Sequence, residues 1–183
     1  ALSKAAVTDN TFTAQVASSE TTGNYATPLW SGTNAGKITV SDGSVTFTQT
    51  EYYPNDGGTV YMKGFAPQAA INTGQVAYTI SGKEDIMVTS EISGSRTDNT
   101  NKELTFNHLL TQLKFKLVAE NADAITYWGS ITSITVKDVE KDLVLNLNTG
   151  ELTVAPTPNK GDLEVSEGFT SKELTTTPAE NGY

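Results

Sequence analysis

Histidine is the side chain that most often transfers protons near neutral pH, and this chain of 183 residues has one, His108. A Ser-His-Asp arrangement or an imidazole metal site would therefore have to use His108. Its neighbours Phe106, Leu109 and Leu110 are apolar, which is typical of a packed segment rather than an open cleft. We expect His108 to be buried, or nearly so, and to have a structural role.

Neighbouring carboxylates are the other candidates for acid–base chemistry, at Glu84-Asp85 and from Asp138 to Asp142. They lie beside turn signals and have lysines close by, which is typical of solvated strand ends. The segment Asn55-Asp56-Gly57-Gly58 lacks the ligand spacing of a calcium loop, so we expect an ordinary turn there.

Several classes of site are excluded by what the sequence lacks. It contains no cysteine, which excludes zinc–thiolate sites, iron–sulfur clusters, thiol catalysis and disulfide bonds. It also lacks the motifs of serine hydrolases, zinc proteases, P-loop proteins and dinucleotide-binding proteins. We therefore predict no catalytic, metal-binding or cofactor-binding residues, no cofactor and no enzymatic activity. A hydrolase that uses His108 and Glu84 is the alternative.

Aromatic side chains are the remaining candidates for binding. The cluster Tyr52, Tyr53, Tyr61 and Phe65 could stack on sugar rings, as aromatic platforms do in glycan-binding modules. Packing into the core beside the neighbouring prolines is the simpler interpretation. The pair Tyr127-Trp128 has the same two interpretations.

The charge balance excludes two kinds of partner. Lys and Arg total 12 against 21 Asp and Glu, which gives a formal net charge of −9. A chain this acidic is repelled by phosphate backbones and anionic lipids, so we expect no nucleic-acid binding. No run of apolar residues approaches the roughly 20 that a membrane helix needs, and any signal peptide is expected to be absent already.

Alternation of apolar and polar residues predicts the elements that position these side chains. It predicts strands at 12–16, 45–47, 76–80, 113–117, 132–136 and 143–147. Turn signals separate them at Asp42-Gly43, Ser81-Gly82 and Asn148-Thr149-Gly150. Short strands with frequent turns predict an all-β fold, an antiparallel β-sandwich with at most one short helix.

Residues 103–119 fit two patterns. The preferred interpretation is a strand over 103–107, a tight turn near 108–111, and a second strand over 112–119. Phe106, Leu109, Leu110 and Leu113 also fit helical spacing, so a helix across 107–117 is the alternative.

A change in composition near residues 155–161, with two prolines and a glycine, predicts a domain edge. We expect a β-sandwich domain over 1–155, followed over 156–183 by a linker and the beginning of a truncated second β domain. Residues 162–183 hold too few apolar groups to fold alone, and we expect the chain to be part of a longer protein.

Several motifs occur in a fixed order along the chain. They are Tyr52-Tyr53-Pro54, Ala66-Pro67, Asp85-Ile86-Met87, Phe106-Asn107-His108, and a leucine-rich hairpin that ends in Thr149-Gly150. Their order and spacing resemble the N-terminal domain of the fimbrillin-like family of Bacteroidales surface proteins, type V pilus subunits, over roughly residues 7–155.

The resemblance implies a transthyretin-like β-sandwich followed by a second sandwich, and no cofactor. It implies export as a lipoprotein, anchoring at the outer membrane, a place in a cell-surface fimbrium, and assembly with other pilin subunits by strand exchange. Within the given residues there is no arginine before Arg96 and no cysteine, and we expect the lipidated cysteine to precede them and the second sandwich to follow residue 183.

Residues 10–17 form a short alternating segment close to the N-terminus. We expect either an edge strand that is removed on maturation and replaced by another subunit, or a permanent edge strand of the sandwich.

The sequence thus predicts a non-enzymatic cell-surface fimbrial subunit or adhesin, with host or bacterial surface glycans or proteins as further partners. The alternative is a surface glycan-binding lipoprotein module that uses Tyr52, Tyr53, Tyr61 or Trp128.

Overall fold

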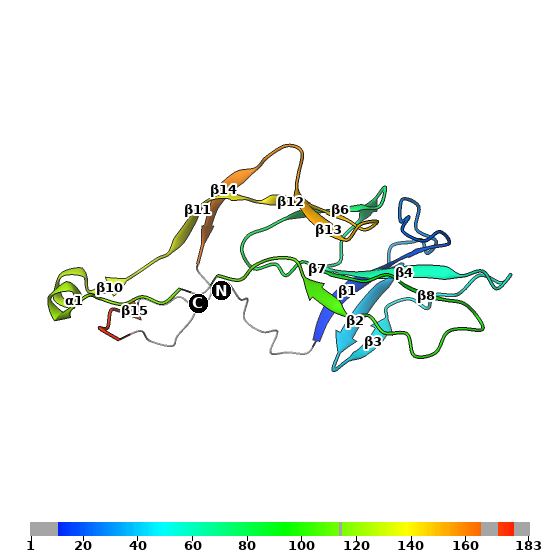
Figure 1. The fold of residues 1–183 in the computed structure, drawn as a ribbon, viewed down its shortest axis with the longest axis horizontal. Coiled ribbons are helices and arrows are strands. Elements are labelled where there is room, and N and C mark those ends of the chain that lie inside the picture. The colour runs from blue at the N-terminus through cyan, green and yellow to red at the C-terminus, as the bar shows by residue number, and fades with distance from the viewer. Residues whose placement is uncertain (1–10, 114, 166–171, 178–183) are drawn as a thin grey trace. The chain divides into compact units, whose positions relative to one another are not determined.

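The computed structural model of the chain describes residues 11–113, 115–165 and 172–177 (Figure 1). Among these residues, 11–110 and 141–159 form one compact unit, the sandwich unit. Residues 111–140 and the described residues from Lys160 onward form the other, the second unit. This grouping differs from the predicted division at residue 155, because residues 111–140 group with the chain after residue 160.

The sandwich unit contains two antiparallel sheets. The larger has the strand order β3-β2-β1-β4-β7-β9, and β8 also pairs with β4. Its strands are β1 (Thr11–Ser19), β2 (Lys37–Ser41), β3 (Ser44–Phe47), β4 (Val60–Ala66), β7 (Met87–Thr89), β8 (Ile92–Gly94) and β9 (Phe106–His108). The smaller sheet has the order β13-β12-β6-β5, from β5 (Ile71–Asn72), β6 (Gln75–Thr79), β12 (Asp142–Asn146) and β13 (Glu151–Val154). The predicted all-β sandwich is confirmed.

Apolar side chains cover both faces of the larger sheet. One buried cluster joins Ala17 and Phe65 of this sheet to Val76 and Leu145 of the smaller one, and it forms the core between the sheets. A second cluster contains Val16 and other side chains that alternate with the first set along the strands, so it lies on the opposite face. Strand β4 is therefore buried along nearly its whole length.

The hairpin between β2 and β3 confirms a turn predicted from the sequence. Ser41 pairs with Ser44, so Asp42 and Gly43 alone form the connection. Both have positive φ, 49° and 78°, as a two-residue type I′ turn requires. Glycine adopts this conformation without steric cost, which explains the Asp-Gly pair here.

Strand β1 is not an edge strand, and both interpretations of residues 10–17 were wrong on this point. Residues Thr11 to Gln15 pair with β2, and Gln15 to Ser19 pair with β4. Residue 10 lies outside the described residues. The long connection from β1 to β2 returns the chain beside its own first strand, so β1 has neighbours on both sides.

The predictions for residues 103–119 were largely wrong. Strand β9 covers three residues, and the described residues of 112–119 form neither a strand nor the alternative helix; Lys114 lies outside the described residues. Alternation alone cannot make a strand, because a partner must run alongside it. Within residues 112–119, Ala119 forms a backbone hydrogen bond to a distant segment: its N–H donates to Thr175 O at 2.9 Å.

The second unit contains two short antiparallel pairs and a helix. Strand β10 (Ser130–Ile131) pairs with β15 (Lys172–Glu173), and β11 (Thr135–Glu140) pairs with β14 (Lys160–Glu164). Helix α1 (Ala122–Trp128) begins after Asn121, whose side chain accepts a bond from Ala124 N at 2.9 Å. It agrees with the expectation of at most one short helix. Within the described ranges no helix has the length and hydropathy needed to cross a membrane.

Candidate functional site

The predicted burial of His108 was wrong. His108 is the last residue of β9, the outermost strand of its sheet, and its side chain is 57% exposed. Its Nδ1 lies 2.9 Å from Asp85 Oδ1. Leu109, the next residue, packs against the core between the sheets, whereas Phe106, two residues earlier, packs against the second apolar cluster. The structure brings no serine or second carboxylate to His108 by a described contact.

The carboxylates considered for catalysis hold turns and strand ends. Glu84 accepts bonds from Ser81 N at 2.6 Å and Ser81 Oγ at 2.7 Å, within one turn. Burial acts to raise the pKa of Glu84, but these hydrogen bonds outweigh it and lower that pKa. Asp142 accepts from Thr79 Oγ1 and Asn159 Nδ2, and these bonds lower its pKa.

The described residues offer no cation site either. They contain no group of three His, Asp or Glu side chains that could hold a metal ion. The segment from Asn55 to Gly58 is a turn, as predicted, with Gly57 N donating to Pro54 O at 3.2 Å and Gly58 N to Asp56 Oδ1 at 2.9 Å.

The structure divides the predicted aromatic cluster. Phe65 is fully buried in the core between the sheets, so its packing interpretation is right. Tyr61 is half-buried on β4. Tyr53 is half-buried and packs against the second apolar cluster, whereas the neighbouring Tyr52 is 76% exposed. Tyr52 and Tyr53 therefore remain candidates for binding.

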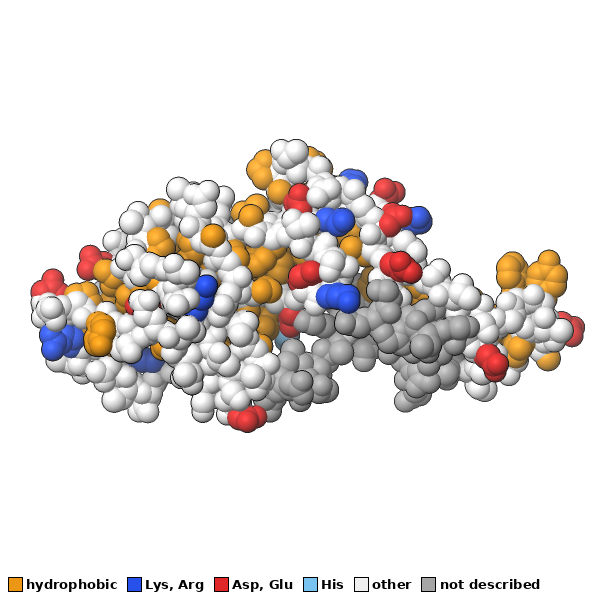
Figure 2. Space-filling model, turned by 180° about the vertical axis from the view of Figure 1, so that it is seen from behind, with side chains coloured by type: hydrophobic (Ala, Val, Ile, Leu, Met, Phe, Trp, Pro, Cys, Tyr) orange, Lys and Arg blue, Asp and Glu red, His pale blue; other side chains and the backbone are white. Residues whose placement is uncertain are grey.

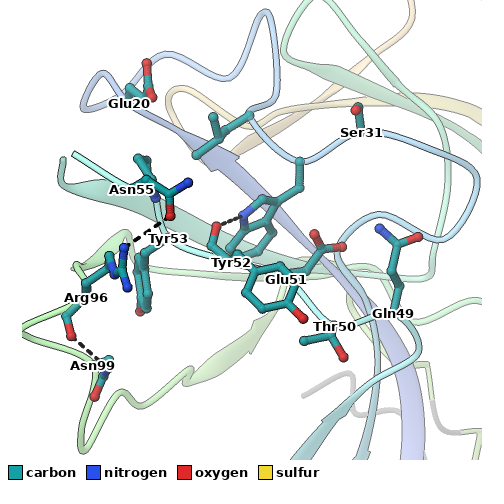
Figure 3. A pocket seen from close by; sticks show the side chains of 13 residues that line it. Glu20, Ser31, Gln49, Thr50, Glu51, Tyr52, Tyr53, Asn55, Arg96 and Asn99 are labelled. Atoms are coloured by element: carbon teal, nitrogen blue, oxygen red, sulfur yellow. Dashed lines mark hydrogen bonds between the residues drawn. The ribbon is translucent and has the colours of Figure 1, made fainter. Parts of the chain in front are cut away.

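Both tyrosines line a pocket of about 940 Å³ in the sandwich unit. We call it the aromatic pocket. Three segments form it: residues 20 and 29–31 after β1, residues 49–55 between β3 and β4, and Arg96 with Asn99 after β8. Figure 3 shows the two tyrosines with polar side chains around them.

Trp30 is held in the pocket from several sides. Its backbone N–H donates to Ser18 Oγ at 2.9 Å, which ties the loop to β1. Its indole Nε1–H donates to Tyr52 O at 3.2 Å, and its ring meets the Phe47 ring edge-on at 5.8 Å. The indole is thus fixed before any ligand arrives.

The other wall is arranged by hydrogen bonds and close packing. Arg96 Nη1 donates to Asn55 Oδ1 at 3.1 Å, and Asn99 Nδ2 donates to Arg96 O at 3.1 Å (Figure 3). Tyr53 packs against Gly94 so closely that a Cβ there would collide with the Tyr53 hydroxyl. Gly94 therefore allows the orientation of Tyr53.

Sequence reasoning missed Trp30, Arg96 and Asn99 as members of this pocket. They come from loops that lie far apart in the sequence, so spacing could not group them. One local signal was available for Trp30, because it is a large aromatic residue between turn-forming residues, Pro28 and Ser31-Gly32.

The pair Tyr127-Trp128 lies at the end of α1 in the second unit. The side chains are 81% and 69% exposed, and their rings meet edge-on at 5.3 Å. The packing interpretation therefore fails for this pair.

A charged network lies elsewhere in the sandwich unit. Glu91 accepts from Tyr25 Oη at 2.6 Å, Thr22 Oγ1 at 2.6 Å and Gly23 N at 2.8 Å. Burial acts to raise the pKa of Glu91, but these bonds and the charge of Lys63 outweigh it and lower the pKa. Burial lowers the pKa of Lys63, whose Nζ lies 5.7 Å from the Tyr25 ring centre. The network braces the loop after β1.

Comparison with known proteins identifies a family and a similar solved structure. The sequence pattern of a family described as fimbrillin-like matches residues 5–182, nearly the whole chain. The crystal structure of a proposed cell adhesion protein from Bacteroides uniformis is similar, with a TM-score of 0.54 and 15% sequence identity. The alignment covers 86% of this chain and 64% of that one, so the likeness shows a shared fold over part of a longer protein. No curated protein matches the chain.

Proposed function

This chain belongs to the fimbrillin-like family, and on that premise we propose that it is a non-enzymatic fimbrial subunit or adhesin of the bacterial cell surface. The observation that carries the proposal is the family match over residues 5–182. The similar Bacteroides uniformis protein, described as acting in cell adhesion, agrees with it. The hydrogen bonds that Glu84 and Asp142 accept at a turn and a strand end also agree with it, since these were the catalytic candidates.

The proposal includes export as a lipoprotein, anchoring at the outer membrane, and joining to other pilin subunits by strand exchange. The position of β1 supports the last point. A strand that replaced β1 would bond to both β2 and β4, because β1 pairs with both. Its alternate side chains would take the places of Val16 in one apolar cluster and Ala17 in the other.

The empty groove would be unstable, which gives exchange its driving force. Loss of β1 would expose two rows of unpaired backbone groups and apolar side chains from both clusters. Thr11 to Gln15 pair with β2 and Gln15 to Ser19 pair with β4, so each row runs along about half of β1. A replacement strand would have to pair with both neighbours.

Strand exchange is tested by cutting the chain after it has folded. A protease site inserted between the exposed Glu20 and Thr21 frees β1 from the rest of the chain. We expect the cut protein to take up a labelled peptide of residues 11–19, seen by native mass spectrometry. A control peptide with aspartate at positions 14 and 16 should not enter, because it would bury two charges. A folded, cut protein that never takes up the labelled peptide would contradict exchange of β1.

The fimbrial role itself is tested on cells. Antibodies raised against the chain should label intact, unpermeabilised cells of the source bacterium along surface filaments in electron microscopy. Deletion of the gene should remove the label and lower adherence. A label found only after permeabilisation would contradict the surface location.

The aromatic pocket favours a second candidate, a surface glycan-binding module. The observation that favours this candidate is an exposed tyrosine beside a fixed indole, with polar side chains around them. The two candidates are compatible, since an adhesin can hold its receptor in such a pocket.

A further inference from the structure

We propose that the aromatic pocket binds a neutral sugar, a hexose or N-acetylhexosamine unit of a surface glycan. The inference rests on the proposed adhesive role for its biological meaning, and it names the partner of that role. The aromatic pocket has a volume of about 940 Å³, within the range of about 300–1,000 Å³ typical of small-ligand sites.

The aromatic side chains provide the first part of the argument. Tyr52 is 76% exposed at the wall of the pocket, so its ring contributes little to the core. The C–H groups on one face of a pyranose ring form a flat apolar surface that packs on an aromatic ring. The Trp30 indole also lines the pocket and is already held by its hydrogen bond to Tyr52 O. A ligand would therefore lose little side-chain freedom in binding.

The polar side chains provide the second part. Ser31, Gln49 and Thr50 line the pocket, and their side chains make no hydrogen bond to another described residue. Arg96 uses one of its five N–H donors on Asn55. The pocket therefore holds donors and acceptors in excess, as a ligand with several hydroxyl groups requires, beside the aromatic wall.

Charge decides between neutral and acidic sugars. The pocket is lined by two carboxylates, Glu20 and Glu51, and one guanidinium, Arg96. The chain as a whole carries a net charge of −9, and the face in Figure 2 shows basic side chains only singly, with no continuous basic patch. A sialylated or sulfated sugar would be repelled, whereas neutral hydroxyl groups can donate to carboxylates and accept from the guanidinium.

The other exposed aromatic pair is a matched control. Tyr127 is as exposed as Tyr52, at 81% against 76%, but its neighbour Trp128 is also exposed and α1 has no buried residue. Neither Tyr127 nor Trp128 lines the aromatic pocket. If any exposed tyrosine sufficed, both substitutions would lower binding equally.

The test uses the intact chain on an array of lactose, N-acetyllactosamine, mannotriose and chitotriose, with 3′-sialyllactose as the acidic counterpart of lactose. We expect saturable binding of at least one neutral oligosaccharide and no stronger binding of 3′-sialyllactose than of lactose. Tyr52→Ala should weaken binding of the neutral ligand about tenfold, the loss of about one aromatic contact. Gln49→Ala should weaken it too, and Tyr127→Ala should leave it unchanged.

Three results would overturn the inference: no saturable binding to any of the neutral sugars, a preference for 3′-sialyllactose, or equal losses in Tyr52→Ala and Tyr127→Ala. Circular dichroism of each variant checks that it is folded, which the exposure of Tyr52 leads us to expect. Failure here would leave strand exchange and surface labelling intact, whereas failure of those tests would leave sugar binding by the chain unaffected. The inference and the proposed function can thus fail separately.

Discussion

Replacing Tyr25 by phenylalanine tests the charged network after β1. The Tyr25 side chain is fully buried, and its hydroxyl donates to Glu91 Oε2 at 2.6 Å. Tyr25→Phe keeps the ring and removes only this donor, so little cavity forms. Hydrogen bonds to charged groups contribute about 1.5–3 kcal/mol. We expect Tyr25→Phe to lower the free energy of unfolding by about 1.5 kcal/mol, near the lower end of this range, because Glu91 keeps its bonds from Thr22 and Gly23.

Urea unfolding followed by tryptophan fluorescence measures this loss. The chain has two tryptophans, Trp30 in the sandwich unit and Trp128 in the second unit. A Trp128→Phe background therefore restricts the signal to the sandwich unit. The control is Tyr52→Phe, which removes a hydroxyl from an exposed side chain and should change stability by less than about 0.5 kcal/mol.

A double-mutant cycle with Glu91→Gln assigns the loss to the pair. The two substitutions should be non-additive, since each removes the same charged hydrogen bond. Equal losses of unfolding free energy in Tyr25→Phe and Tyr52→Phe would refute the reasoning, because the buried hydroxyl would then contribute no more than an exposed one. Full additivity of Tyr25→Phe with Glu91→Gln would refute it too.

The pH dependence follows from the same contacts. The pKa of Glu91 in the folded chain lies below its ordinary value of 4.5. The folded state therefore binds fewer protons than the unfolded state between the two values. The stability that this carboxylate contributes is present above pH 4.5 and is lost as the pH falls through its folded pKa. The difference between the native chain and Glu91→Gln should shrink correspondingly in acid, as urea unfolding at several pH values will measure.

Three further substitutions test the core, the pocket and the corrected histidine. Phe65→Ala should destabilise the sandwich unit by about 3–5 kcal/mol in urea unfolding, because it empties a fully buried site; Val45→Ala, at a site 42% exposed, is its control and should cost far less. Gly94→Ala should displace Tyr53 through the collision of its Cβ with the hydroxyl, lowering sugar binding on the array; unchanged binding would contradict the assigned role of Gly94. His108→Gln should cost less than about 1 kcal/mol, because the His108 side chain is 57% exposed and substitutions at such surface sites change stability little; a larger loss in the same urea assay would restore a structural role.

Much of the secondary structure could be predicted from local patterns. The alternation at 12–16, 45–47, 76–80 and 143–147 marks strands in the structure. The Asp42-Gly43 turn follows from the backbone conformations that these residues tolerate. Such signals lie within a few residues of one another, so a single sequence contains them. The same holds for the all-β fold class.

The pattern failed where a distant partner decides the outcome. Residues 112–119 alternate as well as true strands do, yet the described ones form no strand. His108 has apolar neighbours, yet it lies at the end of an outermost strand and faces solvent. Both depend on which strand runs alongside, and local sequence does not contain that information.

The candidate site shows the same division more sharply. Composition and sequence alone determined the acidic charge, the absence of thiol chemistry, the all-β class and the tyrosines at 52 and 53 as candidates. Only the tertiary structure placed β1 between β2 and β4, buried Phe65 while exposing Tyr52, and brought Trp30 and Arg96 to one pocket. The physical reason is that burial and pocket formation depend on contacts between loops far apart in the chain, whereas strand and turn preferences depend on each residue and its immediate neighbours.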